Sequence, residues 1–180
     1  MIRTVTLTEL FEHPITKKYV KRSGLAHAIA TAHHAFKLSE QYNVNPDLAT
    51  KAAFLHDIGH YTWYKRNGDW DFQSYRENDI HAIKGAERAH KLLIRLGEEP
   101  SSAKQIALAI LLHTDSYLPE GNLKLDPLQK VVALADAADE EPNGNHHYRD
   151  ISFDLARKKL QLLDKLVDEA LKKNQLQRTV

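Results

Sequence analysis

The apolar residues of the chain recur at the three- and four-residue spacing of amphipathic helices, in segments that polar stretches separate. Two segments begin with Asn45-Pro46 and Asp126-Pro127, in which the first residue caps a helix and the proline occupies its first turn. No convincing strand or internal repeat is found. Helices are predicted over residues 25–42, 46–58, 78–97, 100–113, 127–139 and 152–173. We therefore expect an all-α fold, a single domain of six or seven helices over residues 1–180.

The C-terminal helix predicted over residues 152–173 carries one apolar stripe. Its members step by three and four residues and are Phe153, Ala156, Leu160, Leu163, Val167 and Ala170. Such a stripe indicates a helix that docks on the core of its own domain. The alternative is the seam of a homodimer.

Three connections between the predicted helices are polar or irregular: residues 61–77, 114–125 and 140–151. The first of them holds six of the chain's 14 aromatic residues, and it directly precedes His81. Two interpretations stay open for these rings. They pack the loop against its own domain, or they stack on a nucleobase, as aromatic side chains do in other nucleotide sites.

Composition excludes several classes of chemistry. The chain has 180 residues with a net charge of +1, so we expect no long nucleic acid as a partner. It has no cysteine, which excludes disulfides, thiolate metal sites and a cysteine nucleophile. The N-terminus lacks the apolar core of a signal peptide, and the longest apolar run, residues 106–112, is too short to cross a bilayer. We expect a cytoplasmic protein without a membrane partner.

Six ligand-type side chains interrupt apolar helical segments or stand at their ends. They are His27, His56, Asp57, His81, His113 and Asp136. A single buried histidine is usually satisfied by a carbonyl group, but six such residues are harder to explain without a common partner. A divalent cation would accept the imidazoles and neutralise the carboxylates, which are costly to bury unpaired. The sequence therefore predicts a metal site of nitrogen and oxygen donors.

The motifs "FLHDIGH", "HAIKGAERA", "AILLHTDS" and "KVVALADAADE" resemble those of the HD-domain superfamily of metal-dependent phosphohydrolases. The resemblance covers residues 25–140, and the members that look closest are the bacterial hydrolases that split dinucleoside tetraphosphates symmetrically. It implies an HD-domain-like helical bundle with two metal ions that Asp57 bridges. By the same resemblance His27, His56 and Asp136 hold one ion, and His81 and His113 hold the other. The donors fit Fe, Mn, Co, Ni or Zn, and the resemblance favours iron.

A binuclear site of this kind implies hydrolysis of a small phosphorylated substrate, such as a nucleotide. We expect Asp57, Asp136 and His60 to be catalytic. The residues expected to bind substrate are His60, Trp63, Lys65, Arg66, Lys84 and Arg88. Many relatives carry lysine where this chain has His60, and arginine where it has Ala30, so His60 takes the place of a usual phosphate contact.

Two other functions use the same residues. Mixed-valent di-iron oxygenases of the HD superfamily share the ligand set, and one group carries "HDLGH", which "HDIGH" resembles. Their final aspartate usually follows after a longer stretch, whereas Asp136 is only 23 positions after His113 here. The other alternative is a non-catalytic module that binds a metal and a nucleotide.

Overall fold

The computed structural model describes residues 3–61, 71–114 and 124–177, and the described residues are helical without any strand. The elements are α1 (Leu7–Glu12), α2 (Pro14–Ser23), α3 (Leu25–Gln41), α4 (Pro46–Leu55), α5 (Phe72–Glu77), α6 (His81–Arg95), α7 (Pro100–Leu111), α8 (Pro127–Ala137), the 3₁₀-helix η1 (Pro142–Tyr148) and α9 (Phe153–Gln177). The prediction of an all-α fold is confirmed. Of these helices, none is long and apolar enough to cross a membrane.

The predicted number of six or seven helices is wrong, because the described residues alone form nine α-helices. Helices α1 and α2 are short and start from local caps, a Thr6–Glu9 capping box and His13 before Pro14. The segments 72–77 and 142–148 were predicted as loops, but they form α5 and η1. Short polar helices leave too few apolar repeats for a periodicity argument to find them.

Helix α4 is the centre of the bundle. All ten of its residues are buried, and it packs against α3, α7, α8 and α9. Three alanines, Ala49, Ala52 and Ala53, have no exposed surface and allow neighbouring helices to approach closely. The predicted helix ran on to residue 58, whereas α4 ends at Leu55 and the next four residues turn. The turn begins with His56 and Asp57, and its four residues are still buried.

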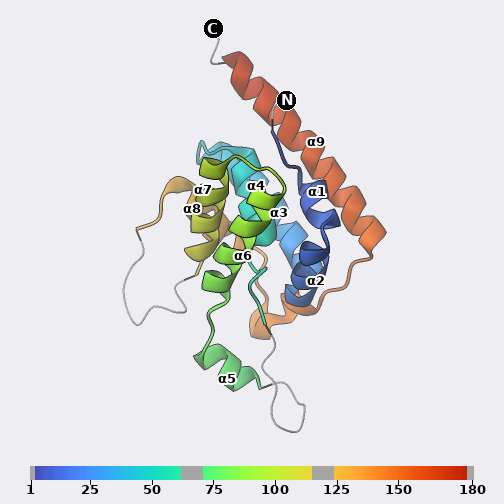
Figure 1. The fold of residues 1–180 in the computed structure, drawn as a ribbon, viewed down its shortest axis with the longest axis vertical. Helices are drawn as coiled ribbons and strands as arrows, with labels where there is room; N and C mark the ends of the chain where they lie inside the picture. Colours follow the sequence, from blue (N-terminus) through green and yellow to red (C-terminus); the bar gives the residue numbers. More distant parts are fainter. Residues whose placement is uncertain (1–2, 62–70, 115–123, 178–180) are drawn as a thin grey trace.

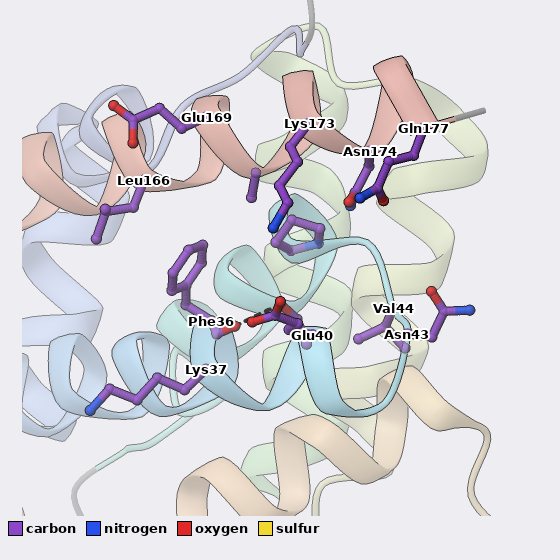
Figure 2. A pocket seen from close by; sticks show the side chains of 13 residues that line it. Phe36, Lys37, Glu40, Asn43, Val44, Leu166, Glu169, Lys173, Asn174 and Gln177 are labelled. Atoms are coloured by element: carbon purple, nitrogen blue, oxygen red, sulfur yellow. Dashed lines mark hydrogen bonds between the residues drawn. The ribbon is translucent and has the colours of Figure 1, made fainter. Parts of the chain in front are cut away.

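Helix α9 lies along one flank of the molecule beside α1 (Figure 1). The buried part of its stripe is Ala156, Leu160, Leu163 and Val167, which confirms docking on the core. A groove of about 600 Å³ lies between α3 and the C-terminal half of α9, where Lys37, Glu40, Glu169 and Lys173 mix both charges (Figure 2). None of the candidate metal ligands lines this groove. The homodimer stays a prediction.

A buried ion network ties the start of α4 to the rest of the bundle. Lys51 has no exposed surface, and its Nζ donates to Asp47 at 2.7 Å and to Glu98 at 2.5 Å. Arg3 reaches Asp47 at 3.3 Å and Asp164 at 2.9 Å, so the network also holds the N-terminal segment against α9. Burial still raises the pKa of Asp47 despite Lys51 and Arg3, so these partners offset its desolvation only in part.

Replacing the buried amine should therefore destabilise the fold strongly. We expect Lys51→Met to lower the free energy of unfolding by about 3–5 kcal/mol, because Asp47 and Glu98 lose their shared cation. Urea denaturation measures the change. The matched control is Lys91→Met, which breaks an exposed pair with Glu87 and should cost less than about 1 kcal/mol. Equal losses in the two variants would contradict the role of the buried network.

Candidate metal centre

The six predicted ligands come from the ends of five helices and meet at one place. His27 stands in the first turn of α3, His81 is the first residue of α6, and Asp136 lies one residue before the end of α8. His56 and His113 directly or closely follow α4 and α7. Each side chain is thus fixed by a rigid helix, although the residues are up to 109 positions apart in sequence.

Asp57 lies at the middle of this cluster, and its side chain is only 6% exposed. Its Oδ2 is 3.3 Å from His56 Nε2 and 4.0 Å from His27 Nε2. Its Oδ1 is 3.5 Å from His81 Nε2 and 3.8 Å from His113 Nε2. The two oxygens of one carboxylate therefore face two different pairs of imidazoles.

Asp136 adds a second carboxylate on the Oδ2 side of Asp57. Its Oδ1 lies 3.0 Å from His27 Nε2 and 3.2 Å from His56 Nε2. On the opposite side, His81 Nε2 and His113 Nε2 are 3.1 Å apart. Two neutral imidazoles that approach through lone pairs repel each other, so this pair favours a bound cation or proton between them.

Backbone carbonyl groups fix the tautomer of two of these histidines. His56 Nδ1 donates to the carbonyl oxygen of Ala53 at 2.7 Å, and His113 Nδ1 donates to that of Ile110 at 2.6 Å. A carbonyl oxygen only accepts, so in the neutral ring the lone pair stands on Nε2. This is the atom that faces Asp57 in both cases.

Carboxylates hold the other two histidines in the same way. His27 Nδ1 lies 2.7 Å from Asp139 Oδ2, and His81 Nδ1 bonds Asp79 Oδ2. Carboxylate–histidine pairs are the usual outer support of metal-binding imidazoles, because they fix the ring and raise its basicity. Neither Asp79 nor Asp139 was predicted as part of the site.

The electrostatics of the cluster favour a positive charge at its centre. Burial alone would lower the pKa of His56, but the carboxylates of Asp57 and Asp136 raise it well above its usual value. Burial lowers the pKa of His113 to about 4, with His56 and His81 acting in the same direction. Burial alone would raise the pKa of Asp57, yet the neighbouring imidazoles hold it well below its ordinary range.

The donor set fits a divalent metal ion. In the described part of the chain, the buried His56 Nε2 has no hydrogen-bond partner, although two carboxylate oxygens lie within 3.3 Å of it. A buried polar atom without a partner is costly, and metal ligation would remove that cost. Several sets of three side chains from this cluster bring their ligand atoms within 4.8 Å of one another. Nitrogen and oxygen donors without thiolate suit Zn, Fe, Mn, Co and Ni.

Two more histidines lie at the rim of the cluster. His60 Nε2 is 3.0 Å from Asp57 Oδ1, and its ring stacks on His81 with centroids 4.2 Å apart. His147 Nδ1 is 3.8 Å from Asp57 Oδ2 and donates to the carbonyl oxygen of Ser23 at 2.6 Å. The sequence predicted His60 as part of the site. His147, which lies on η1, was not predicted.

His146, which neighbours His147 on η1, faces the cluster with the opposite tautomer. Its Nδ1 accepts the backbone N–H of Glu141 at 2.9 Å, so the neutral ring carries its proton on Nε2. The residue is buried, and the centroid of its ring lies 4.4 Å from the centroid of the His27 ring. In this tautomer Nε2 carries a proton rather than a lone pair, although His27, His146 and His147 also form a group whose ligand atoms lie within 4.8 Å of one another.

The residues predicted to bind substrate are only partly described. The Lys84 ammonium lies 4.3 Å from the centroid of the Tyr61 ring. Arg88 stacks on Tyr19 at 3.6 Å and also donates to the carbonyl oxygen of Ile58. These contacts tie α6 to the turn that carries Asp57. Trp63, Lys65 and Arg66 lie outside the described residues.

Two glycines let that turn and α6 touch. A Cβ on Gly59 would overlap the carbonyl oxygen of His81 and the backbone nitrogen of Gly85. A Cβ on Gly85 would lie 3.2 Å from the carbonyl oxygen of His56, which is tight but tolerable with a small shift. The glycine pair thus sets the distance between Asp57 and His81.

We expect Gly59→Ala to push α6 away from the turn and to reduce metal content severely, because the new methyl group meets backbone atoms that cannot rotate aside. Elemental analysis of purified protein and the thermal midpoint are the measurements. Gly85→Ala is the control, and it should lower the metal content and the thermal midpoint less than Gly59→Ala does. A Gly59→Ala variant that holds metal like the unchanged chain would contradict this account of the packing.

Removing a carboxylate behind a ligand should weaken metal binding without removing a ligand. We expect Asp139→Asn to lower the affinity for the metal by about 10–100-fold, because His27 loses its charged partner. Competition with a chromophoric chelator measures the affinity. Asp150→Asn, at an exposed position that follows η1 in sequence, should leave the affinity unchanged.

Three comparisons relate this chain to known proteins. The model of the HD domain family matches residues 24–141. The "Putative phosphohydrolase YueE" of Bacillus subtilis (strain 168) is 65% identical over 169 residues, which cover 94% of this chain and 96% of that protein. A solved structure, a "predicted HD superfamily hydrolase" from an uncultured Thermotogales bacterium, is 22% identical and covers 96% of this chain and 99% of that one, with a TM-score of 0.49. By the family match and the 65% identity, the chain belongs to the HD domain family.

Proposed function

We propose that the protein is a metal-dependent phosphohydrolase that uses two ions. The observation that carries the proposal is the placement of Asp57, whose Oδ2 faces His27 and His56 while its Oδ1 faces His81 and His113. A carboxylate placed in this way can bridge two cations. Membership of the HD family and the phosphohydrolase name of the Bacillus subtilis relative support the same chemistry.

The two halves of the centre have matching outer support. In each half one histidine is backed by a carboxylate (His27 or His81) and the other by a backbone carbonyl group (His56 or His113). Asp136 adds a donor only to the half that contains His27. The half that contains His81 lacks this second carboxylate, which supports the proposal that water or substrate binds there, since catalytic metal sites keep an open position.

Bound ions would act as Lewis acids on phosphoryl oxygens and bring the pKa of a coordinated water toward neutrality. The chain's own residues would hold the ions, orient the water and neutralise the substrate. Asp136 has a carboxylate oxygen within 3.2 Å of two candidate ligand nitrogens, which supports the proposal that it accepts a proton from that water. His60 lies at the rim with its side chain 17% exposed, which supports the proposal that it contacts a phosphoryl oxygen.

The substrate class proposed is a small phosphate ester or anhydride, with a nucleotide as the first candidate. Lys84 is one turn from His81 on α6, and its ammonium is already close to an aromatic ring, Tyr61. Roles in substrate binding for Arg88 and for Trp63, Lys65 and Arg66 stay predictions, as do iron as the metal and the likeness to dinucleoside-tetraphosphate hydrolases. The net charge of +1 gives no support to a long nucleic acid as substrate.

The test is a substitution of the central carboxylate. We expect Asp57→Asn to lose at least one ion per chain and to lower the rate of phosphate release by more than about 100-fold. Loss of a residue that supports a metal ligand lowers affinity or activity by about 10–100-fold, and loss of a ligand itself should cost at least as much. Metal analysis and a phosphate-release screen over a nucleotide panel are the measurements. Asp154→Asn, an exposed carboxylate on α9, is the control.

Two outcomes would count against the proposal. One is an Asp57→Asn variant that keeps the metal content and rate of the unchanged chain. The other is substrate-dependent uptake of dioxygen by iron-loaded protein without phosphate release, which would favour the oxygenase alternative.

A further inference from the structure

Resting on the proposed function, we propose that the substrate is a phosphomonoester of a neutral, partly apolar alcohol, whose organic group occupies a pocket between the end of α7 and α8. The reaction transfers the phosphoryl group to water: a P–O bond forms to the water oxygen and the bond to the alcohol oxygen breaks. The leaving oxygen takes a proton, so the products are the alcohol and orthophosphate. Phosphoanhydrides, whose leaving group is itself a phosphate, are excluded as preferred substrates.

The pocket lies beside the metal centre, where the side chain of Asp136 is 14% exposed and that of His113 is 1% exposed. It has a volume of about 340 Å³, at the lower end of the range for small-molecule sites. Its eight lining residues are Leu112, His113, Thr114, Leu125, Ala133, Asp136, Ala137 and Glu140. His113 and Asp136 are candidate ligands from the two opposite halves of the centre. A group bonded to a phosphoryl at the metals would therefore have this pocket within reach.

Among the described residues, half of the pocket wall is apolar, and the wall contains neither lysine nor arginine. Four of the eight lining residues are Leu112, Leu125, Ala133 and Ala137. Apart from the two ligands, the polar contributions come from Thr114 and the carboxylate of Glu140. Contact with apolar side chains favours an organic group that leaves water on binding.

The charge of the pocket disfavours a second phosphate. A phosphate leaving group carries negative charge that needs cations or N–H donors around it. Glu140 would repel it, and neither a lysine nor an arginine is among the eight lining residues.

The imidazoles that can face a phosphoryl group lie elsewhere on the rim. His60 and His147 approach Asp57 at 3.0 and 3.8 Å, and neither lines the pocket. The site is thus divided into a part rich in donors for one phosphoryl group and a part suited to a neutral organic group. This division matches a monoester, because the described residues of the pocket offer an additional phosphate no lysine or arginine.

The first test compares leaving groups on the metal-loaded full chain. Each nucleoside 5′-monophosphate is paired with the diphosphate of the same nucleoside, and phenyl phosphate is paired with pyrophosphate. We expect kcat/KM for the monoesters to exceed that for the anhydrides by at least about 10-fold. This is the size of discrimination that enzymes reach when one substrate group fits a pocket and its competitor does not. Equal values, or a preference for anhydrides including dinucleoside tetraphosphates, would overturn the inference and leave the proposed function standing. No phosphate release from any compound would overturn both.

The second test narrows the pocket. Ala137→Phe should lower kcat/KM for the preferred monoester by about 10-fold or more, while metal content and the inhibition constant of orthophosphate stay unchanged. The control is Ala138→Phe at the next position, which is exposed and does not line the pocket. A loss of the same size in both variants, or in neither, would show that the organic group binds elsewhere.

The third test reverses the charge of the pocket. Glu140→Lys should raise the ratio of kcat/KM for a nucleoside diphosphate to that for the monophosphate by several-fold, and Glu140→Gln should give an intermediate ratio. A ratio that does not change across the three chains would contradict the role given to Glu140.

Discussion

The structure depends on the burial of one carboxylate. Asp57 lies at the end of a fully buried helix, where an unpaired charge would cost several kcal/mol. Imidazoles from three other helices and from its own neighbour His56 surround it, and each ring must reach the same point. The bundle is therefore arranged so that helix ends converge, and the close contact of Gly59 with α6 follows from that requirement.

The partners behind the imidazoles explain why the cluster is suited to a cation. A histidine ligates through a lone pair, and an unsupported ring can place its proton on either nitrogen. A carboxylate or carbonyl oxygen lies at Nδ1 of His27, His56, His81 and His113. These oxygens accept hydrogen bonds and do not donate them, so each neutral ring keeps its proton on Nδ1 and its lone pair on Nε2. The same reasoning separates His146, whose Nδ1 accepts an N–H, from the four rings that face the carboxylates.

Periodicity and capping predicted the longer helices closely, since apolar stripes and Asx-Pro starts are local signals. The ligands were predictable for a similar reason: His56 and Asp57 contrast with the apolar residues before them. Asp139 and His147 lie in a polar stretch, where a functional carboxylate or imidazole looks like any exposed one. Their contacts arise only when η1 folds back on the start of α3, and no local pattern encodes that approach.

In the proposed reaction, helix α8 links metal binding to the choice of substrate. It carries the candidate ligand Asp136, and Ala133 and Ala137, three residues before and one after, form part of the pocket wall. Glu140 follows one turn after Asp136, so the charged end of the pocket lies close to the same helix end. Because one rigid element fixes both the ligand and the wall, an organic group held by the alanines is held at a set distance from the metals. Positioning of this kind lowers the entropic part of the barrier, so a change in the pocket should reach the rate as well as the affinity.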